Sequence, residues 1–586
     1  MIVPMSKVYI VTQSYNHARL LEVLAQLGVV HVEPVEPEKA IAAEQTINTL
    51  SILDKAVQIL RTIEPSDESP EISPIEAAKE TLHIHKTMAD EKDRLATLHR
   101  KAEQLKIWGN VELRQLERLR SDGIKIRFFS VSKKDIPGLE AECIETVAEQ
   151  SGQNVLIAVI DRTGRFKTPE GAKKVLWPSM DLPMVKKEAA RVDASLKKHN
   201  ERLSELANLI EAIQQQRKHY QTQADFSIVQ RSGLSSDALF ALQGWVPSRK
   251  SESLSEHLSE HNITAAVEIL SVNQDEEPPT LVEYPGWTKP IKGLFDMLGT
   301  VAGYREFDVS APFMLALPIF AAMLIGDGGY GAVLFFGLLL GYKKISPSLG
   351  RDFTKLLIIV GAVSLIWGFL CDSFFGAPLL HKALIPVNMT DKSRFMLMNI
   401  SFTMGAIHLS IAQLWQAFKF FPDLRFLGKV GWAIFIWGML GVVKMFVLSG
   451  SIAWSTPWPY FLTVGAALAI LFNSPSKNIF KMVLLGLANF PLSMLGAFSD
   501  VISYVRLMAV GLASGVLAAS FNDLALNSGS WLIAAPTLIL GHSLNLGLAM
   551  IALFAHGVRL NMLEFSNNLG MQWIGYSYKP FKTIQE

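Results

Sequence analysis

The sequence predicts a mainly α-helical membrane protein. We expect a polytopic membrane helical bundle of about eight spans, preceded by a cytoplasmic dumb-bell of two small α/β lobes joined by an antiparallel coiled coil. The 586 residues are 49% hydrophobic and 19% charged, which is too apolar for a soluble protein of this size and too charged for a membrane bundle alone. Charges crowd the first half, where heptad repeats occur, and long apolar runs begin near Pro312.

Composition excludes several kinds of function. A formal net charge of +1 does not indicate nucleic-acid binding. Cys143 and Cys371 lie in different halves and suggest neither a disulfide framework nor a metal site. The charged half has no GxxxxGK[ST] phosphate loop and no HExxH motif, so we expect no catalytic residue, metal or cofactor. The N-terminus has no signal-peptide pattern, which predicts that the first half stays in the cytoplasm.

The proximal lobe is predicted from two distant pieces of chain, residues 1–40 and 235–300. The first piece contains KVYIV, SYNHARLLEVLAQLG and VVHVEPV, which is typical of strand–helix–strand. The second contains ALFALQGWVP and AAVEILSV, which predict strands on either side of a helix from Ser251 to His261. We expect both pieces to form one lobe at the base of the coiled coil.

The coiled-coil hairpin is predicted over residues 41–120 and 183–234. Apolar residues at spacings of three and four mark both arms, and a break with three prolines interrupts the first. The second arm has the clearer seam: Val192, Leu196, His199, Leu203, Leu206, Ile210 and Ile213. His199 is either a pH switch or a tolerated polar core position.

Residues 121–182 are predicted to form a distal α/β lobe at the far end of the hairpin. They contain KIRFFSV, an acidic helix-like stretch and NVLIAVI. Two globular ends joined by a coiled coil suit a spacer, a tether or a rod that resists twisting.

The membrane domain is predicted over residues 301–586. Its apolar segments are 312–326, 329–342, 355–375, 395–420, 427–449, 457–472, 490–524 and 531–563. The first two are short and separated only by GDGG, so one long helix is an alternative. Asp327 in this motif and Asp372 after the third segment are interpreted as turn or capping residues.

Loop charges predict the orientation. Lysine and arginine gather in the loops before spans three, five and seven, the last of which carries Lys477 and Lys481. This pattern fits eight spans with the N-terminal half and the C-terminal KPFK both cytoplasmic.

Arg506 lies near the centre of a long apolar segment. A guanidinium at that depth is costly and keeps its proton, so it marks a functional site by default. The simpler alternative is an arginine paired with a neighbouring helix for assembly. Small residues surround it and allow close helix approach: Ser499, Ser503, Ala509, Ala513, Ser514 and Ala518. We expect no carboxyl of this chain at matching depth, so a second subunit should supply one.

The last span carries a polar stripe. Residues at spacings of three and four fall on one face: His542, Asn545, Ala549, Ala552, His556 and Arg559. Glu564 follows near the cytoplasmic end. Two intramembrane arginines need acceptors or water, so this stripe is predicted to border an aqueous cavity.

These motifs resemble the membrane stator subunit of V-type and archaeal-type rotary ATPases, the subunit a or subunit I family, in its prokaryotic form. The resemblance covers nearly the whole chain and is carried by PFMLALPIFAAMLIGDGGYG, DSFFG, GAIHLSIAQ, SDVISYVRLMAVGLA and HGVRLNMLEF. It implies that Arg506 faces a rotating ring of proteolipid (c/K-type) subunits, with Arg559 beside it and two aqueous half-channels meeting there. It also implies that the soluble lobes bind peripheral-stalk (E/G-type) subunits, and that a central-stalk socket (d/C-type) subunit is a partner.

Ion-translocation candidates under this resemblance are listed together: Arg506, Arg559, Glu564, His556, Ser503, His542 and Asn545. The chain departs from eukaryotic members at Ser514 and Ala549, where a histidine and a glutamate are expected. Such a subunit is not an enzyme itself, because ATP is hydrolysed or made in partner subunits, and it lies in lipid, here the prokaryotic plasma membrane. The rival interpretations are a secondary ion-coupled transporter with a cytoplasmic regulatory domain and a membrane-tethered scaffold.

Overall fold

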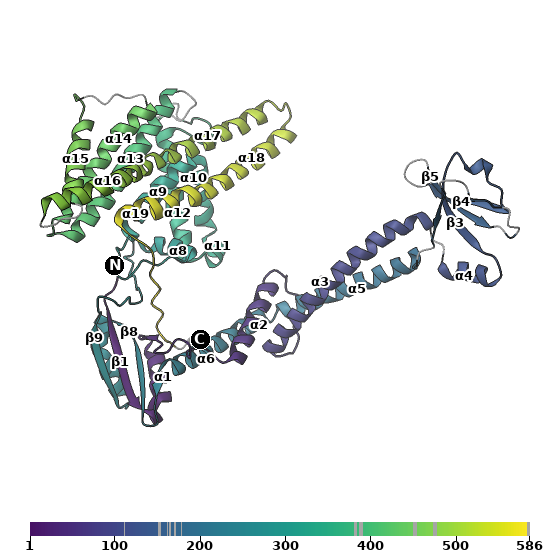
Figure 1. Cartoon of the computed structure of the whole chain (residues 1–586), viewed down its shortest axis with the longest axis horizontal. Helices are drawn as coiled ribbons and strands as arrows, with labels where there is room; N and C mark the ends of the chain where they lie inside the picture. Colours follow the sequence, from purple (N-terminus) through teal and green to yellow (C-terminus); the bar gives the residue numbers. More distant parts are fainter. Residues whose placement is uncertain are drawn as a thin grey trace.

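The structure, a computed structural model, has four parts that are visible in Figure 1. A bundle of apolar helices lies next to a small sheet, and a long helical hairpin runs from that sheet to a second sheet at its far end. The described residues are 1–109, 112–149, 154–160, 162, 166–168, 172–176, 179–379, 384–385, 391–448, 454–472 and 478–582. Lys477, one of the predicted loop cations, lies outside them.

The N-terminal lobe is a five-stranded antiparallel sheet in the order β2-β8-β1-β9, with β7 also paired to β8. Its elements are β1 (Met5–Gln13), α1 (His17–Leu27), β2 (His31–Glu33), β7 (Leu234–Ser235), β8 (Leu239–Pro247), α7 (Ser248–Glu260) and β9 (Ala265–Ser271). Val8 and Ile10 alternate on one face of β1 and pack with Leu20 and Leu24 of α1 in a buried core. The predicted strand–helix–strand order and the strands around α7 are confirmed.

The hairpin consists of four helices. They are α2 (Glu44–Leu60), α3 (Pro74–Leu105), α5 (Leu182–Ala207) and α6 (Ile210–Ser232). The predicted seam is buried in one continuous cluster that includes Leu196, Leu203 and Leu206. The second arm is interrupted between α5 and α6, where Asn208 Nδ2 donates to the carbonyls of Ser66 and Glu68, each at 2.7 Å. This bond pattern fixes the break of one arm against the proline-containing break of the other.

His199 is half-buried in the hairpin, and its Nδ1 lies 3.1 Å from Glu91 Oε2 on the facing helix.

The distal sheet has the strand order β4-β5-β3-β6. Its elements are α4 (Leu113–Ser121), β3 (Ile126–Ser132), β4 (Cys143–Glu149), β5 (Asn154–Ile160) and β6 (Lys173–Val175). The expected acidic helix between KIRFFSV and NVLIAVI is wrong, because Cys143–Glu149 pairs antiparallel with β5. Backbone pairing to a buried neighbour outweighs the helical propensity of its glutamates and alanine.

The membrane part contains a helix at each of the eight predicted segments. They are α9 (Ser310–Ile325), α10 (Gly328–Leu340), α12 (Arg351–Cys371), α13 (Asp391–Phe420), α14 (Arg425–Leu448), α15 (Trp458–Phe472), α16 (Ile479–Ser503) continued by α17 (Val505–Leu526), and α18 (Trp531–Ala552). Shorter helices are α8 (Lys289–Leu298), α11 (Tyr342–Leu349) and α19 (Ser566–Leu569).

Length and composition make five of the described helices able to cross a membrane, or six if the bent pair α10 and α11 is one span. Helices α9 and α15 are apolar but shorter, so the count of eight spans stays a prediction. The seventh segment begins earlier than predicted, because Phe480–Leu526 forms one 47-residue candidate.

Asp327 separates α9 from α10 and is more than a turn residue. It is fully buried and caps α10 by accepting from the Gly329 and Tyr330 amides. The same carboxylate accepts from Ser373 Oγ and from the Phe375 and Gly376 amides, all at 2.8–2.9 Å. One side chain therefore ties the α9–α10 break to the loop after α12.

Candidate functional site

Arg506 is the second residue of α17, directly after the junction with α16. The preceding Tyr504 is fully buried, and its hydroxyl lies 2.8 Å from His408 Nδ1 on α13. Gly405, one turn earlier on α13, allows this approach, since a Cβ there would lie 2.5 Å from Tyr504 Cγ. Packing of Tyr504 thus fixes the start of α17, and with it the direction of the arginine.

A second close approach lies five residues further along α17. A Cβ on Gly511 would lie 2.1 Å from the Met323 carbonyl oxygen of α9, and one on Gly326 would lie 2.7 Å from the Gly511 oxygen. Gly326 has a φ of 68°, which favours glycine. The backbones of α9 and α17 therefore touch, which holds Arg506 at a fixed depth in the bundle.

The last membrane helix changes geometry where its charged residues lie. Two π-helical turns, Leu553–Val558 and Leu560–Phe565, follow α18. In a π-helix the hydrogen bonds join residues five apart, and such turns occur often at functional sites. Arg559 and Glu564 are five residues apart, and this geometry brings them to the same side.

Glu564 contacts both arginines. Its Oε1 atom lies 3.2 Å from Arg506 Nη2 and 3.8 Å from Arg559 Nε. The Glu564 side chain is only 6% exposed, against 23% for Arg506 and 54% for Arg559. The expectation that no carboxyl of this chain reaches the depth of Arg506 is therefore wrong, because a regular α-helical spacing does not place Glu564 beside Arg559.

The pair leaves hydrogen-bonding capacity unused. Among the described residues, Arg506 Nη1 and Glu564 Oε2 are buried without a hydrogen-bond partner. A guanidinium offers five N–H donors in a planar fork. Arg506 can therefore donate hydrogen bonds to a further carboxylate while it stays paired with Glu564.

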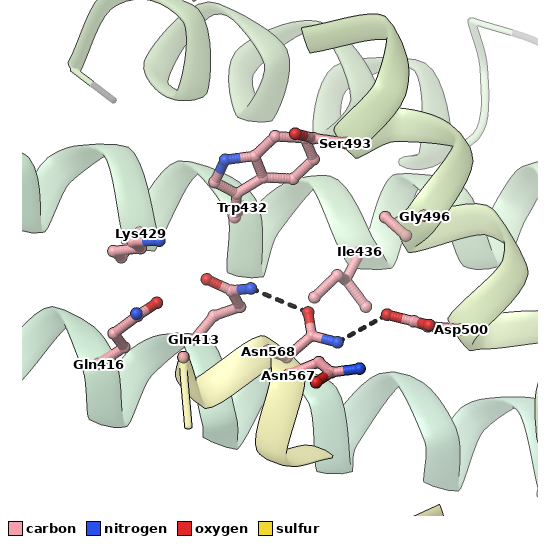
Figure 2. Close-up of a pocket in the computed structure, with 12 residues that line it drawn as sticks. Gln413, Gln416, Lys429, Trp432, Ile436, Ser493, Gly496, Asp500, Asn567 and Asn568 are labelled. Carbon is pink, nitrogen blue, oxygen red and sulfur yellow. Dashed lines mark hydrogen bonds between the residues drawn. The ribbon is translucent and has the colours of Figure 1, made fainter. Parts of the chain in front are cut away.

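A polar cavity of about 420 Å³ lies one helical turn beyond Glu564, where Asn568 is one of the residues that line it (Figure 2). Its central feature is a chain of three side chains: Gln413 Nε2 donates to Asn568 Oδ1 at 2.9 Å, and Asn568 Nδ2 donates to Asp500 Oδ2 at 2.7 Å. Asn568 also donates to the Glu564 carbonyl at 2.8 Å. Lys429 and Gln416 line the same cavity.

Sequence reasoning did not select Asp500, Asn568 or Gln413 as site residues. The sequence does contain a pattern that indicates Asn568. This residue follows Glu564 by four positions and extends the polar stripe of the last helix by one turn.

A second polar cluster lies nearer the other end of α17 and α18. Tyr330 is its centre: its hydroxyl lies 2.8 Å from His542 Nδ1 and accepts from Asn545 Nδ2 at 2.9 Å. Asn545 also donates to the Ser514 carbonyl at 2.8 Å, and His542 Nε2 lies 3.1 Å from Asn522 Oδ1. A mainly apolar cavity of about 550 Å³ borders His542.

The structure therefore divides the predicted site residues. Arg506, Arg559 and Glu564 meet, whereas His542 and Asn545 belong to the second cluster, roughly 20–25 Å from Arg559 along a helix that rises about 1.5 Å per residue. Ser503 Oγ donates to the Ser499 carbonyl of its own helix at 2.9 Å.

His556 lies half-buried in the first π turn, one turn before Arg559. Within the described ranges no group of three or more His, Cys, Asp or Glu side chains is placed to hold a metal ion.

The apolar helix bundle carries a partly buried arginine–carboxylate pair and two polar clusters, and it is joined to an extended hairpin domain. These features define a membrane subunit with an intramembrane charged site. Residues 175–379 match the family model described as the V-type ATPase 116kDa subunit family. V-type ATP synthase subunit I of Borreliella burgdorferi is 27% identical, with 100% of each chain covered. V-type ATP synthase subunit I 1 of Treponema pallidum is 26% identical, covering 99% of this chain and 100% of the relative.

A-type ATP synthase subunit I of Methanocaldococcus jannaschii is 26% identical over 60% of this chain and 56% of its own. A solved structure, that of the cytoplasmic N-terminal domain of subunit I, homolog of subunit a, of V-ATPase, is 18% identical, with a TM-score of 0.20 and coverage of 45% of this chain and 99% of that one. The chain is thus similar over its whole length to V-type ATP synthase subunit I proteins, the family that its sequence motifs resemble.

Proposed function

We propose that this chain is the ion-translocating stator subunit of a rotary V/A-type ATPase or ATP synthase. The observation that carries the proposal is the Arg506–Glu564 pair, in which the partly buried guanidinium keeps one buried nitrogen, Nη1, without a partner among the described residues. A positive group so placed lowers the pKa of an approaching carboxyl and makes it release its ion. Arg506 would do this to a carboxyl on each ring subunit in turn.

Glu564 is proposed to act as the counter-ion of Arg506 between such encounters. A buried arginine without a partner is strongly unfavourable, so a resident carboxylate stabilises it until a ring carboxylate competes. Arg559, which is more exposed and contacts the same Glu564 oxygen, is proposed to support both groups electrostatically.

The two polar clusters are proposed to border the ion paths on opposite sides of Arg506. The cavity with Asp500 and Asn568 would serve the side of the soluble lobes. Ser503 and His556 are proposed as further residues of the polar access paths. The cluster of His542 and Asn545 would serve the opposite side. Lateral access of the ring fits the exposure of Ala509 and Ala513, which follow Arg506 at helical spacings.

The soluble parts are proposed to hold this membrane site still against rotation. In this proposal the soluble half consists of three rigid units: the proximal lobe (residues 1–40 and 235–300), the distal lobe (121–182) and the hairpin between them. These units bind E/G-type peripheral stalks and a d/C-type socket subunit from the cytoplasm. ATP chemistry belongs to partner subunits. The hairpin's continuous buried seam is the feature suited to bearing load.

Cross-linking in the assembled complex tests the proposed rotor contact. A thiol-specific photo-cross-linker would be placed at Ala513→Cys, on the exposed face of α17, with Ala518→Cys, which is buried, as the matched control. Both would be made after Cys143→Ser removes the exposed native thiol. Adducts to the proteolipid ring from position 513 alone are expected. Adducts from neither position, or active ion transport by the chain without any ring, would favour a secondary transporter instead.

A further inference from the structure

Residues 571–582, which we call the C-terminal strap, leave the last membrane helix and return to the N-terminal lobe. Figure 1 shows the strap as the yellow trace running from α19 towards α1 and α6. Its first part is held at the membrane end. The Trp573 ring lies 5.6 Å from Phe295, and the Trp573 amide donates to Glu306 Oε1 at 3.2 Å. Gly575 passes so close to Ala302 that a Cβ there would lie 2.0 Å from the Ala302 oxygen.

The middle of the strap pairs with the chain segment that joins the lobe to the membrane helices. The Thr280 amide donates to the Tyr576 carbonyl at 2.8 Å, and the Tyr578 amide donates to the Thr280 carbonyl at 3.0 Å. On the other side of the same segment, the Val3 amide donates to the Leu281 carbonyl at 2.9 Å. Residues 280–282 are therefore paired through backbone hydrogen bonds with segments from both ends of the chain.

The end of the strap is part of the lobe's core. The Phe581 amide donates to the Val30 carbonyl at 2.8 Å, and its side chain is only 8% exposed. Phe581 packs in the cluster that contains Val8 and Leu24, and its ring lies 5.9 Å from Phe226 on α6. Helix α6 is one of the hairpin helices, so the strap ends against the root of the hairpin.

The other end of the strap is continuous with the charged site. Glu564 precedes Leu569, the last residue of α19, by five residues. Phe565 is fully buried and stacks on His408 at 4.4 Å. The Met571 amide donates to the Ser566 carbonyl at 2.9 Å. The chain between Glu564 and Phe581 contacts the rest of the protein every few residues, so it contains no long flexible linker.

We propose that the C-terminal strap is a positioning element: it fixes the last membrane helix against the root of the hairpin, and so holds Glu564 and Arg559 opposite Arg506 when the hairpin bears load. The consequence for ion transport rests on the proposed stator function. The strap's anchorage itself does not. A strap that only fills the lobe's core would matter for stability but not for coupling.

The test uses reconstituted complexes with Phe581→Ala, and Ile574→Ala as the matched control, because Ile574 lies on the same strap but is 58% exposed. Truncating a buried phenylalanine should raise the undocked population by roughly 150-fold to several thousandfold. Hydrogen exchange at the Thr280 amide reports docking, and ions moved per ATP hydrolysed report coupling. Phe581→Ala should speed this exchange and lower the ion-to-ATP ratio, whereas Ile574→Ala should change neither. Phe581→Leu should restore both.

A deletion of residues 576–586 gives a strap that cannot dock, and co-purification of the partner subunits shows that the complex still assembles. An assembled deletion complex with an unchanged ion-to-ATP ratio overturns the strap proposal. That outcome differs from failure of the stator proposal, which would appear as ion pumping that persists after loss of the Arg506 guanidinium.

Discussion

Arg506 and Glu564, 58 residues apart in the sequence, form an ion pair with 3.2 Å between Arg506 Nη2 and Glu564 Oε1. Each belongs to a different membrane helix, and each keeps one buried atom without a partner in the part of the chain that the structure describes. Although Glu564 compensates the charge of Arg506, the Nη1 atom of Arg506 can still donate to one more carboxylate. Most of the proposed mechanism follows from this arrangement.

Replacing Glu564 by Gln should destabilise the membrane domain. The amide keeps the shape of the side chain but removes the charge that compensates Arg506, and breaking a buried ion pair costs about 3–5 kcal/mol. The expected result is a lower thermal midpoint of the detergent-solubilised complex. The midpoint is measured by size-exclusion chromatography of samples heated to a series of temperatures. Asp423→Asn, which alters an exposed pair with Arg425, should leave the midpoint unchanged. Equal midpoints for both variants would show that Glu564 does not compensate Arg506.

Replacing Gly511 by Ala should separate α17 from α9. The added methyl group would meet the Met323 carbonyl at 2.1 Å, and overpacking of this kind costs about 1–3 kcal/mol. Ion pumping should fall together with thermal stability, since Arg506 shares the displaced helix. Gly547→Ala on α18 is the control, because a Cβ there has nothing within 4 Å. If Gly511→Ala matches this control in both assays, the backbone contact does not set the depth of Arg506.

Asp327→Asn should disrupt the junction between α9 and α10. Both carboxylate oxygens accept hydrogen bonds, and an amide nitrogen cannot accept the two bonds that one of them receives from Ser373 Oγ and the Gly376 amide. Leaving buried donors unpaired costs about 1–3 kcal/mol each. We expect a lower yield of folded protein in fluorescence-detected size-exclusion chromatography. The exposed Asp523→Asn serves as control, and normal yield of both variants would contradict the structural role of Asp327.

Docking of the strap should depend on pH through His31. Its Nδ1 accepts from the Lys579 amide at 2.9 Å, and burial beside the Lys579 ammonium lowers the pKa of His31. Tyr576 and Tyr578 also lie beside this ring, and burial raises the pKa of each to about 12, so neither titrates near neutrality. The docked state thus favours neutral His31. Docking is fully stabilised above the ordinary histidine pKa of 6.5 and weakens as the pH falls below it.

Exchange of the Thr280 amide, corrected for the intrinsic effect of pH, measures this dependence. Faster exchange is expected at pH 5 than at pH 8, the extremes of the range in which histidine ordinarily titrates. His31→Asn supplies a neutral acceptor that does not titrate, so its corrected exchange should be the same at both values. Glu33 and Lys7, which pair with each other in the same part of the sheet, and Lys579 are unchanged in that variant. A wild-type protein without any pH dependence would remove His31 from the docking contact.

Regular patterns in the sequence predicted much of the fold. Apolar runs placed a helix at all eight segments, and the heptad seam around Leu196 and Leu203 predicted the buried face of the hairpin. Sequence patterns gave a wrong result where the local pattern did not reflect the interaction that determines the structure. The strand Cys143–Glu149 looked helical because its pairing partner lies outside the local window. The extension of α16 back to Ile479 was missed because Lys481 interrupts the apolar run.

The charged site was only half predictable. Arg506 and Arg559 were selected because a guanidinium in an apolar segment is costly wherever it lies. Their contact with Glu564 depends on two π-helical turns, which 3.6-residue periodicity cannot predict. Phe581 was missed for another reason: its partners Val30 and Phe226 are hundreds of residues away, and no periodic pattern marks such a contact.

ATP-driven ion uptake by vesicles that contain the Arg506→Ala complex tests the proposed role of Arg506 in ion release. Arg425→Ala, an exposed arginine at the start of α14, provides the matched control. If Arg506 discharges the ring carboxyl, the Arg506→Ala complex assembles with its partner subunits but moves no ions, whereas Arg425→Ala pumps like the wild type. Continued ion uptake by the assembled Arg506→Ala complex would contradict this role.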